Sequence, residues 1–482
     1  METSRFLVNG EWRTSTAKRP VVNPYEGVIV GEVYQASSGD IEEAISAAVE
    51  SFDHTKRLSS HERSEILRKI SDEIGRRKEE LACLITLETG KPISFSRVEV
   101  NRCVLTFRLS SEEAGRIEGT VLPLDLAPNS EGRTALVRRF PLGPISAITP
   151  FNFPLNLVAH KLGPAIASGN TVVLKPSSNG PLTSIELGRI VETAGYPRGG
   201  LNIVPCLAGE ANQLVEDQRI KAISFTGSPA VGWALKARAG KKRVLLELGG
   251  NAGVIVDDSA DLDLAMKSLI PGSYGNAGQS CIAVQRIFVH DLLYDRFLDR
   301  FVDLSKAVAV GDPMDEKTIV GPMITEAAAK KVETWISEAV AAGARLLCGG
   351  NRRGAMLDPT ILVDTPAHLS VCAQEVFAPV VTIQRFDDFA DAVRMVNDSV
   401  FGLQAGIFSN SLKNIFYAYE ELEVGGVIVN DSSAYRMDHM PYGGVKDSGF
   451  GREGVRYAIE EMTEMRLLAL NVSLPLLVTH RK

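Results

Sequence analysis

"KAISFTGSPAVG", residues 221–232, joins an apolar strand to a helix through a glycine turn. We predict the strand at 222–226, the turn at Gly227 and Ser228, and Gly232 within the helix. The N-terminus of a helix offers unpaired N–H groups and a positive dipole end, and both favour a pyrophosphate. The glycine spacing, however, is GxxxxG and not GxGxxG. Taken alone, the stretch fits a plain strand-to-helix turn equally well.

The alternation of strand and helix extends on both sides of this stretch. Before it, "ISAIT" from Ile145 precedes a helical pattern over 156–167, and "TVVLKP" from Thr171 precedes a helix that begins near Leu182. After it, "AGVIVD", a helix over 261–275 and "VQRIFVH" start a second set. Such apolar strands alternating with helices predict parallel sheets covered on both faces. We therefore predict an α/β protein with two doubly wound parallel-sheet domains, the first of which binds a dinucleotide beyond the carboxyl ends of its strands.

Two local signals mark the N-terminal region. Asn9-Gly10 lies between apolar runs and predicts a tight hairpin. Asp40 followed by Glu43 resembles a capping box at the start of a helix. Two further helical patterns run through about 60–85 and 94–117.

Length and composition narrow the class of protein. A chain of 482 residues, 45% hydrophobic and 23% charged, predicts a soluble protein of two or three domains. A net charge of −7 argues against a nucleic-acid partner, which would need a basic surface. The opening "METSRF" has no signal-peptide pattern and no apolar run is long enough for a bilayer, so we expect no membrane association. Six cysteines without a CxxC pair predict neither disulfides nor a metal site and favour a cytoplasmic location.

One of these cysteines, Cys281 in "NAGQSCIAVQR" (276–286), follows glycine, amide and hydroxyl residues and precedes an apolar run. Free cysteine is often buried and behaves as a small apolar side chain. A cysteine at the end of a polar loop can also be a nucleophile that a substrate reaches. The local sequence favours the first interpretation, so any support for the second must come from the rest of the chain.

Other polar residues stand where catalytic groups could lie. Glu247 is isolated in the leucine run of "LLELGGN" (245–251), either as a solvent-facing acid on an edge strand or as a carboxylate with a raised pKa, suited to general base chemistry. Asn152 in "ITPFNFPLN" (148–156) is either a turn former or an amide donor for an oxyanion. "QEVFAPV" (374–380) adds an acid and an aromatic residue on a turn into a strand.

Together these segments resemble the aldehyde dehydrogenase superfamily over nearly the whole chain. The motifs stand in the family's order: "PFNFP", "KPS", "FTGSPAVG", "LELGGN", "GNAGQSC", "EVFAP", "GGVIVN" and "PYGGVKDSGFGREG". The resemblance implies the family's fold, with a Rossmann-like cofactor domain, a catalytic domain and an oligomerisation hairpin. It also implies NAD(P)-dependent oxidation of an aldehyde to the carboxylic acid.

Position by position, the resemblance implies three catalytic residues and no metal. Cys281 matches the nucleophile, which forms a thiohemiacetal and then a thioester. Asn152 matches the side-chain donor of the oxyanion hole, which it shares with the backbone N–H of Cys281. Glu247 matches the base that activates water for hydrolysis of the thioester.

The resemblance also implies a cofactor, NAD or NADP. Lys175 matches the lysine at the adenosine ribose, and Glu375 and Phe377 match the pair at the nicotinamide ribose and ring. Ser178 stands where many members have a glutamate that repels a 2′-phosphate, so NADP stays open, whereas we expect little effect from Ala378 in place of a usual glycine. The complete set of implied cofactor residues is Lys175, Ser178, Gly227, Ser228, Gly232, Glu375, Phe377, Thr149, Pro150, Phe151, Leu248 and Gly249.

The substrate is implied only as a class. The motifs look most like the lactaldehyde and non-phosphorylating glyceraldehyde-3-phosphate side of the family, so we expect a small hydroxylated or anionic aldehyde; phosphonoacetaldehyde, sulfolactaldehyde and succinate semialdehyde are alternatives. A coenzyme A-acylating enzyme or a non-catalytic protein of the same fold fits less well, because Cys281, Glu247 and Asn152 are all present. An arginine near the entrance would hold an anionic group by two parallel hydrogen bonds. The residues expected to face the aldehyde are Arg108, Phe153, His160, Ser280, Ile282, Tyr435, Arg436 and His439.

We expect the dinucleotide-binding domain to comprise 1–121 and 142–249, and the catalytic domain 250–462, with a cleft between them. Segments 122–141 and 463–482 resemble the family's oligomerisation strands, with the tail completing a partner's sheet. A leucine-rich tail is hard to leave exposed, so we expect a homodimer or homotetramer.

Overall fold

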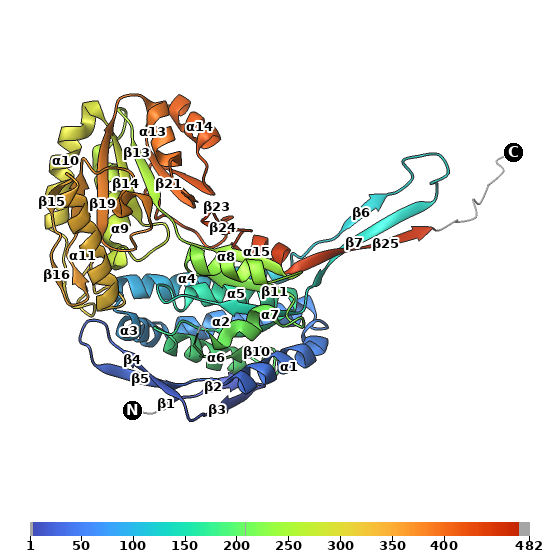
Figure 1. Cartoon of the computed structure of the whole chain (residues 1–482). Helices are drawn as coiled ribbons and strands as arrows, with labels where there is room; N and C mark the ends of the chain where they lie inside the picture. Colours follow the sequence, from blue (N-terminus) through green and yellow to red (C-terminus); the bar gives the residue numbers. More distant parts are fainter. Residues whose placement is uncertain (1–2, 208, 472–482) are drawn as a thin grey trace.

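Two large sheets, each covered by helices, form the body of the molecule, and a narrow arm projects from it (Figure 1). The computed structural model describes residues 3–207 and 209–471. The first sheet lies in the lower half of Figure 1 and the second in the upper half. Their central strands are buried on both faces, as parallel sheets under helices require. The predicted α/β class is confirmed.

The first sheet holds eight strands, which are in spatial order β24 (Gly449–Phe450), β12 (Arg243–Glu247), β11 (Ala222–Thr226), β8 (Pro144–Ile148), β9 (Thr171–Lys175), β10 (Leu201–Ile203), β2 (Phe6–Val8) and β3 (Glu11–Arg13). The five strands β8 to β12 are parallel. After β8 the chain builds β9 and β10 on one side, then crosses to build β11 and β12 on the other. The order therefore reverses between β8 and β11, which is where a doubly wound sheet binds its ligand.

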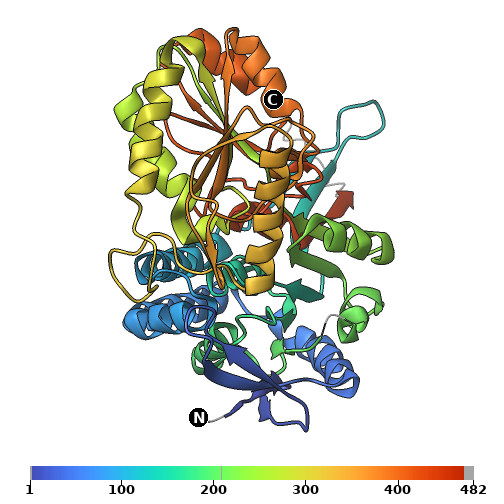
Figure 2. The ribbon, with the colours of Figure 1, turned by 60° about the vertical axis from the view of Figure 1, so that its left-hand side comes forward.

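Helices cover both faces of this sheet (Figures 1 and 2). They are α1 (Ser38–Thr55), α2 (Ser60–Arg76), α3 (Lys78–Thr89), α4 (Ile93–Ala114), α5 (Asn156–Ser168), α6 (Leu182–Thr193), η1 (Glu210–Asn212), α7 (Gln213–Glu216) and α8 (Pro229–Arg238). The strand, turn and helix predicted from the opening stretch are confirmed, because β11 ends at Thr226 and Ser228 is the N-cap of α8.

The N-terminal signals have different outcomes. The hairpin at Asn9 and Gly10 is confirmed, since these residues join β2 to β3 with φ of 51° and 68°. The capping box predicted at Asp40 and Glu43 is wrong by one turn. Ser37 is the N-cap: its Oγ accepts the backbone N–H of Asp40 at 3.2 Å, while Asp40 Oδ2 accepts the N–H of Ser37 at 2.8 Å. Asp40 closes the box and does not open it.

The second sheet has seven strands, in spatial order β15 (Arg345–Cys348), β18 (Thr360–Val363), β19 (Val380–Phe386), β14 (Val284–His290), β13 (Ala252–Val256), β21 (Gln404–Phe408) and β22 (Gly426–Val429). All but β15 run parallel. Its helices are α9 (Leu262–Tyr274), η2 (Gly275–Gly278), α10 (Asp291–Lys306), α11 (Glu326–Ala341), α12 (Ser370–Ala373), α13 (Phe389–Asn397) and α14 (Leu412–Glu421). The repeat of the same architecture explains why the sequence pattern repeats after residue 250.

The chain then returns to the first sheet before its end. Strand β24 pairs antiparallel with β12, and Val455 and Ile459 of α15 (Val455–Glu461) lie in the core of the first sheet. Residues 449–462 therefore pack with the first sheet, although the sequence assigned everything from 250 to 462 to the second domain. Short strands carry no sequence signal for the sheet that they join.

The arm consists of β6 (Thr120–Pro123), β7 (Arg133–Pro141) and β25 (Thr463–Asn471), with β7 in the middle (Figure 1). Strand β25 pairs antiparallel with β7 of the same chain along its whole length. Since β25 is an edge strand, this pairing uses one side of its backbone and leaves the other side without a partner in the described ranges. The expectation that the tail also completes a partner's sheet stays a prediction. The rest of the predicted tail, 472–482, lies outside the described residues.

Small sheets complete the fold. They are formed by β1 (Thr3–Ser4), β4 (Lys18–Val22) and β5 (Ile29–Tyr34), by β16 (Arg352–Arg353) and β17 (Met356–Leu357), and by β20 (Phe401–Gly402) and β23 (Val445–Lys446). No helix in the described ranges is long and apolar enough to span a bilayer.

Candidate active site

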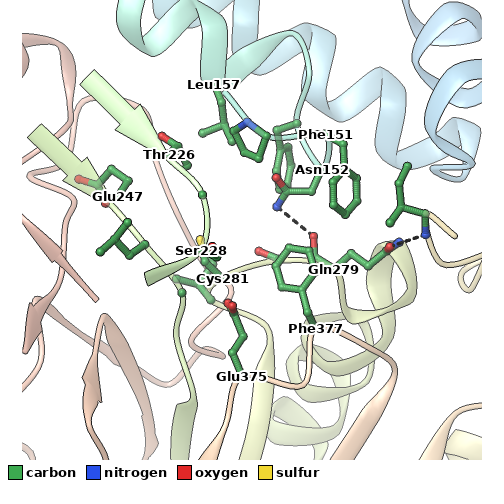
Figure 3. A pocket seen from close by; sticks show the side chains of 18 of the residues that line it. Phe151, Asn152, Leu157, Thr226, Ser228, Glu247, Gln279, Cys281, Glu375 and Phe377 are labelled. Atoms are coloured by element: carbon green, nitrogen blue, oxygen red, sulfur yellow. Dashed lines mark hydrogen bonds between the residues drawn. The ribbon is translucent and has the colours of Figure 1, made fainter. Parts of the chain in front are cut away.

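A cavity of about 380 Å³ lies between the two sheets (Figure 3). The first sheet contributes residues at the carboxyl ends of its strands: Asn152 after β8, 226–228 after β11 and Glu247 at the end of β12. The second sheet contributes the segments that precede β14 and β19, with Cys281 and Glu375. The cavity therefore lies at the switch point of the first sheet and has the volume of a small-ligand site.

The loop before Cys281 has an unusual backbone. Asn276, Ala277 and Gly278 all adopt left-handed conformations, with φ of 53°, 54° and 66°. Gln279 fixes this loop, since its Nε2 donates to the carbonyl of Asn276 at 3.2 Å and its Oε1 accepts the N–H of Ile324 at 2.8 Å. Strained conformations persist only where the surroundings determine them, and they cluster at active sites.

The thiol of Cys281 faces the cavity next to a tyrosine. Its Sγ lies 3.0 Å from Oη of Tyr442, which also lines the cavity. Burial raises the pKa of the Cys281 thiol to about 12, and the hydrogen bond with Tyr442 opposes this shift. The second glycine of "LELGG" explains the position of the loop, because a Cβ on Gly250 would collide with the carbonyl of Cys281. Sequence reasoning missed Tyr442, although it lies in the quoted "PYGG".

Two N–H donors lie near the thiol. The side chain of Asn152 is buried, and its Nδ2 donates one hydrogen bond to the carbonyl of Gln279 at 3.1 Å, drawn in Figure 3. The amide has a second N–H, which has no protein acceptor among the described residues. Within the same ranges the backbone N–H of Cys281 makes no hydrogen bond. Both groups are available to a developing oxyanion.

Glu247 is buried at the end of β12, where it is 3% exposed. Neither carboxylate oxygen has a hydrogen-bond partner in the described part of the chain. Burial, and then the nearby charge of Glu453, raise the pKa of Glu247 well above its ordinary value. The alternative of a solvent-facing acid on an edge strand is wrong, because β24 covers that edge of β12.

Two arginines reach the cavity wall, Arg102 from α4 and Arg436 from the loop after β22. Asp438 holds Arg102, accepting from its Nη2 at 2.7 Å and from its Nε at 3.2 Å. The same carboxylate contacts His160 Nε2 at 2.8 Å, and His160 Nε2 lies 3.4 Å from Nη2 of Arg436. The two guanidinium groups therefore converge on one buried pair, Asp438 and His160.

Arg436 keeps unused donors. Its Nη2 contacts Glu453 at 3.2 Å, and its guanidinium lies 3.5 Å from the ring centroid of Tyr442. Its Nε is buried and has no hydrogen-bond partner in the residues described. A buried cationic donor without an acceptor is costly unless a ligand completes it.

The structure separates the residues predicted to face the aldehyde. Phe153, Ser280, Ile282 and Arg436 line the cavity. Arg108 does not: its side chain is 73% exposed and lies 3.7 Å from Glu112 on the outer face of α4. The cavity wall does not include the remaining three residues. His160 is buried beneath the arginines, whereas Tyr435 and His439 are exposed.

Most residues predicted to hold a cofactor lie in the cavity wall: Pro150, Phe151, Gly227, Ser228, Leu248, Gly249, Glu375 and Phe377. Glu375 accepts the N–H of Gly250 at 3.0 Å, and burial raises the pKa of Glu375 to about 7. Phe377 packs edge-on against Phe151, with ring centroids 6.0 Å apart.

Four of the predicted cofactor residues are outside the wall. Thr149 is buried, and Gly232 lies in α8, where a Cβ would collide with Leu248. Lys175 is buried at the end of β9, and Ser178 follows in a smaller hollow that Arg19 and Ser177 also line. Over residues 3–207 and 209–471 we find no cluster of three or more histidine, cysteine or acidic side chains that could hold a metal.

Comparison with known proteins identifies the family. The sequence profile of the aldehyde dehydrogenase family matches residues 12–468. The chain is 46% identical over 468 residues to a 3-sulfolactaldehyde dehydrogenase of Priestia aryabhattai, covering 97% of this chain and 98% of that protein.

Solved structures of the same family are similar over nearly the whole chain. Aldehyde dehydrogenase 21 of Physcomitrella patens, in complex with the reaction product succinate, has a TM-score of 0.96 at 45% identity and covers 98% of each chain. The glyceraldehyde-3-phosphate dehydrogenase GapN of Methanocaldococcus jannaschii, complexed with NADP, has a TM-score of 0.91 at 40% identity, covering 95% of this chain and 100% of that one. The chain belongs to the aldehyde dehydrogenase family and is an oxidoreductase that acts on aldehydes.

Proposed function

We propose that this enzyme oxidises a short aldehyde with an anionic group to the carboxylic acid, with NAD or NADP as the acceptor. The observation that carries the proposal is one cavity lined by Cys281, Asn152 and Glu247 and by the arginines Arg102 and Arg436. Relatives named for 3-sulfolactaldehyde and succinate semialdehyde support the anionic class. A relative named for lactaldehyde supports a short, hydroxylated aldehyde.

In the proposed reaction Cys281 is the nucleophile. Its thiolate attacks the aldehyde carbon, a C–S bond forms and the carbonyl electron pair moves to oxygen. Asn152 Nδ2 and the backbone N–H of Cys281 stabilise that oxyanion, an effect worth about 3 kcal/mol for each donor. After oxidation the thioester on Cys281 is attacked by water, and Glu247 takes the proton from that water. The C–S bond then breaks, the carboxylic acid is released and Cys281 leaves as the thiolate.

The residues present fit a dinucleotide. Gly227 and Ser228 open α8 at the switch point, where unpaired N–H groups favour a pyrophosphate. Glu375 and Phe377 would hold the nicotinamide end, and Lys175 and Ser178 the adenosine ribose; the other residues of the predicted set are Gly232, Thr149, Pro150, Phe151, Leu248 and Gly249. When bound, the nicotinamide accepts the hydride. A neutral Ser178 supports the use of NADP as well as NAD.

The two arginines account for the anionic substrate class. Arg102 donates two hydrogen bonds to Asp438, and within the described ranges its other N–H groups are free to bind a ligand. Arg436 has a buried Nε without a partner among the described residues. Two guanidinium groups in one cavity wall suit a carboxylate, sulfonate or phosphate on the aldehyde.

The test compares anionic aldehydes, such as succinate semialdehyde and sulfolactaldehyde, with neutral propanal, following cofactor reduction. We expect Arg102→Ala and Arg436→Ala to raise KM for an anionic aldehyde about tenfold or more and to change KM for propanal little, because a charge-assisted hydrogen bond is worth about 1.5–3 kcal/mol. Arg108→Ala is the matched control, since that side chain is exposed outside the cavity.

Three outcomes would count against the proposal. Equal losses with both aldehydes would make the arginines structural. A preference of the parent enzyme for long or aromatic aldehydes would exclude the anionic class. A dependence of turnover on coenzyme A would replace hydrolysis by acyl transfer.

We also propose a homodimer or homotetramer in the cytoplasm. All six cysteines are free, as expected in a reducing compartment. The arm leaves large apolar side chains exposed, including Leu126 at 86%, Met465 at 70% and Leu468 at 56%. Such a surface suits another copy of the chain.

The proposed domain division keeps a cofactor domain (1–121 and 142–249), a catalytic domain (250–462) and assembly strands (122–141 and 463–482). It is modified in one respect, because residues 449–462 pack with the first sheet.

A further inference from the structure

The hydroxyl of Tyr442 has one hydrogen-bond partner among the described residues, and that partner is the sulfur of Cys281 at 3.0 Å. The tyrosine is 4% exposed. Its backbone is held on both sides by Glu453, whose carbonyl accepts the N–H of Tyr442 at 3.0 Å and whose N–H donates to the carbonyl of Tyr442 at 2.6 Å. The position of the hydroxyl is therefore set by the fold.

The ring is fixed as well. The guanidinium of Arg436 lies 3.5 Å from its centroid, in the geometry of a cation–π contact. Burial raises the pKa of Tyr442 well above its ordinary value, so the phenol keeps its proton at neutral pH. A protonated hydroxyl beside a sulfur that must become anionic is a hydrogen-bond donor to that anion.

We propose that Tyr442 is a further catalytic residue, whose O–H donates a hydrogen bond to the sulfur of Cys281 and stabilises the attacking thiolate. The inference rests on the proposed role of Cys281 as the nucleophile. The thiol proton leaves to solvent, the thiolate forms the C–S bond, and the carbonyl electron pair moves to oxygen. The phenol keeps its own proton throughout and is unchanged at the end.

The other charged groups that face the thiol do not replace this donor. Glu247 and Glu375 raise the pKa of Cys281, and Arg436 lowers it through its charge without a hydrogen bond to the sulfur. Tyr442 is thus the one hydrogen-bond partner of the sulfur in the described ranges. A hydrogen bond to an ionised acceptor is about twice as strong as one between neutral groups.

The experiment measures the alkylation rate of Cys281 by iodoacetamide against pH, with the modified peptide quantified by mass spectrometry. Tyr442→Phe keeps the ring and removes only the donor. We expect the titration of the Cys281 thiolate to move to higher pH and alkylation near pH 8 to slow about tenfold. The fraction of thiolate at this pH falls, and the greater nucleophilicity of a thiolate with a higher pKa offsets only part of that loss. Tyr435→Phe, at an exposed tyrosine outside the cavity wall, should follow the parent profile.

Kinetics add an independent readout. Tyr442→Phe should slow the first turnover with an anionic aldehyde and leave its KM nearly unchanged, since Arg436 and the ring are still present. A variant with the parent's thermal unfolding curve and the parent's alkylation profile would overturn the proposal, as would a faster first turnover. If an alkylated or Cys281→Ala enzyme still oxidised aldehydes, the nucleophile assignment would fail instead, so the two failures are distinguishable.

Discussion

At the scale of single residues, the protein gives two neighbouring carboxylates opposite environments. Glu453 accepts from Lys161 at 3.0 Å and from Arg436 at 3.2 Å. Burial would raise the pKa of Glu453, but Lys161, His160 and Arg436 lower it to about 2. Glu247 has no such partners in the described part of the chain, and its pKa is raised. Divergent pKa values of this kind favour the proposed role of Glu247 as the base and leave Glu453 as an ionised structural group.

Glu247→Gln should therefore stall hydrolysis and spare attack and oxidation. We expect a burst of about one reduced cofactor per active site, then turnover slowed about 10²- to 10⁴-fold, the usual worth of a general base. In the parent, a raised pKa means that the basic carboxylate is lost at higher pH than for an exposed glutamate, so hydrolysis should slow as pH falls through that pKa. Rapid-mixing kinetics of the parent, this variant and the exposed control Glu112→Gln would check both points; a variant as fast as the parent would remove Glu247 as the base.

Ser178 carries a second prediction at this scale. Ser178→Glu places a carboxylate beside the proposed ribose site and should weaken 2′,5′-ADP binding at least tenfold by like-charge repulsion, with a smaller effect on ADP. Calorimetric titration measures both without turnover. Ser130→Glu, on the loop of the arm, is the control. Equal changes for the two ligands would mean that residue 178 does not face the 2′ position.

At the scale of elements, the strand–helix alternation predicted the sheets and their helices, but it could not select the face that a helix buries. Arg102 and Arg108 lie on the same helix, α4, and six residues turn the direction of a side chain by about 240°. Packing of α4 on α2 and α5 points Arg102 to the cavity and Arg108 to solvent. Tyr442 and Asp438 were missed for a similar reason, because only folding brings their loop to the nucleophile and to α4 and α5.

Asp438 couples these elements and gives a prediction. It accepts hydrogen bonds from Arg102 on α4 and from Asn156 Nδ2 on α5 at 3.1 Å, besides its contact with His160. Although burial alone would raise it, the contacts with His160 and Arg102 hold the pKa of Asp438 well below its usual range. Asp438→Asn presents N–H groups to these donors and should release Arg102.

We expect Asp438→Asn to raise KM for an anionic aldehyde about tenfold, with little change for propanal. Loss of a negative charge would by itself favour an anion, so a rise in KM identifies positioning and not charge. Steady-state kinetics on both aldehydes measure the difference, with Asp263→Asn at an 86% exposed side chain as the control. An unchanged or lower KM would show that Arg102 needs no support from Asp438.

At the scale of the whole molecule, the arm is best explained by contact with another copy of the chain. Strand β7 is paired on both sides, whereas β25 is an edge strand with one side unpaired in the described ranges. Both faces of β25 also carry exposed apolar side chains, with Leu467 at 54% and Leu468 at 56%. A projecting sheet of this kind adds little to the stability of its own chain. The sequence predicted the strands from their resemblance to assembly elements, but it did not reveal that β25 pairs with β7 of the same chain.

Assembly through the arm predicts a particle larger than the 52.1 kDa chain. Leu467→Asp should weaken association by at least tenfold, because it would bury an unpaired charge in an apolar contact. Light scattering over a range of concentrations measures the mass, and activity on a neutral aldehyde reports whether the cavity survives. Leu412→Asp, at a 69% exposed leucine on α14, introduces the same charge away from the arm and should leave the mass unchanged. A parent enzyme that is a stable and active monomer would show that the arm has another role.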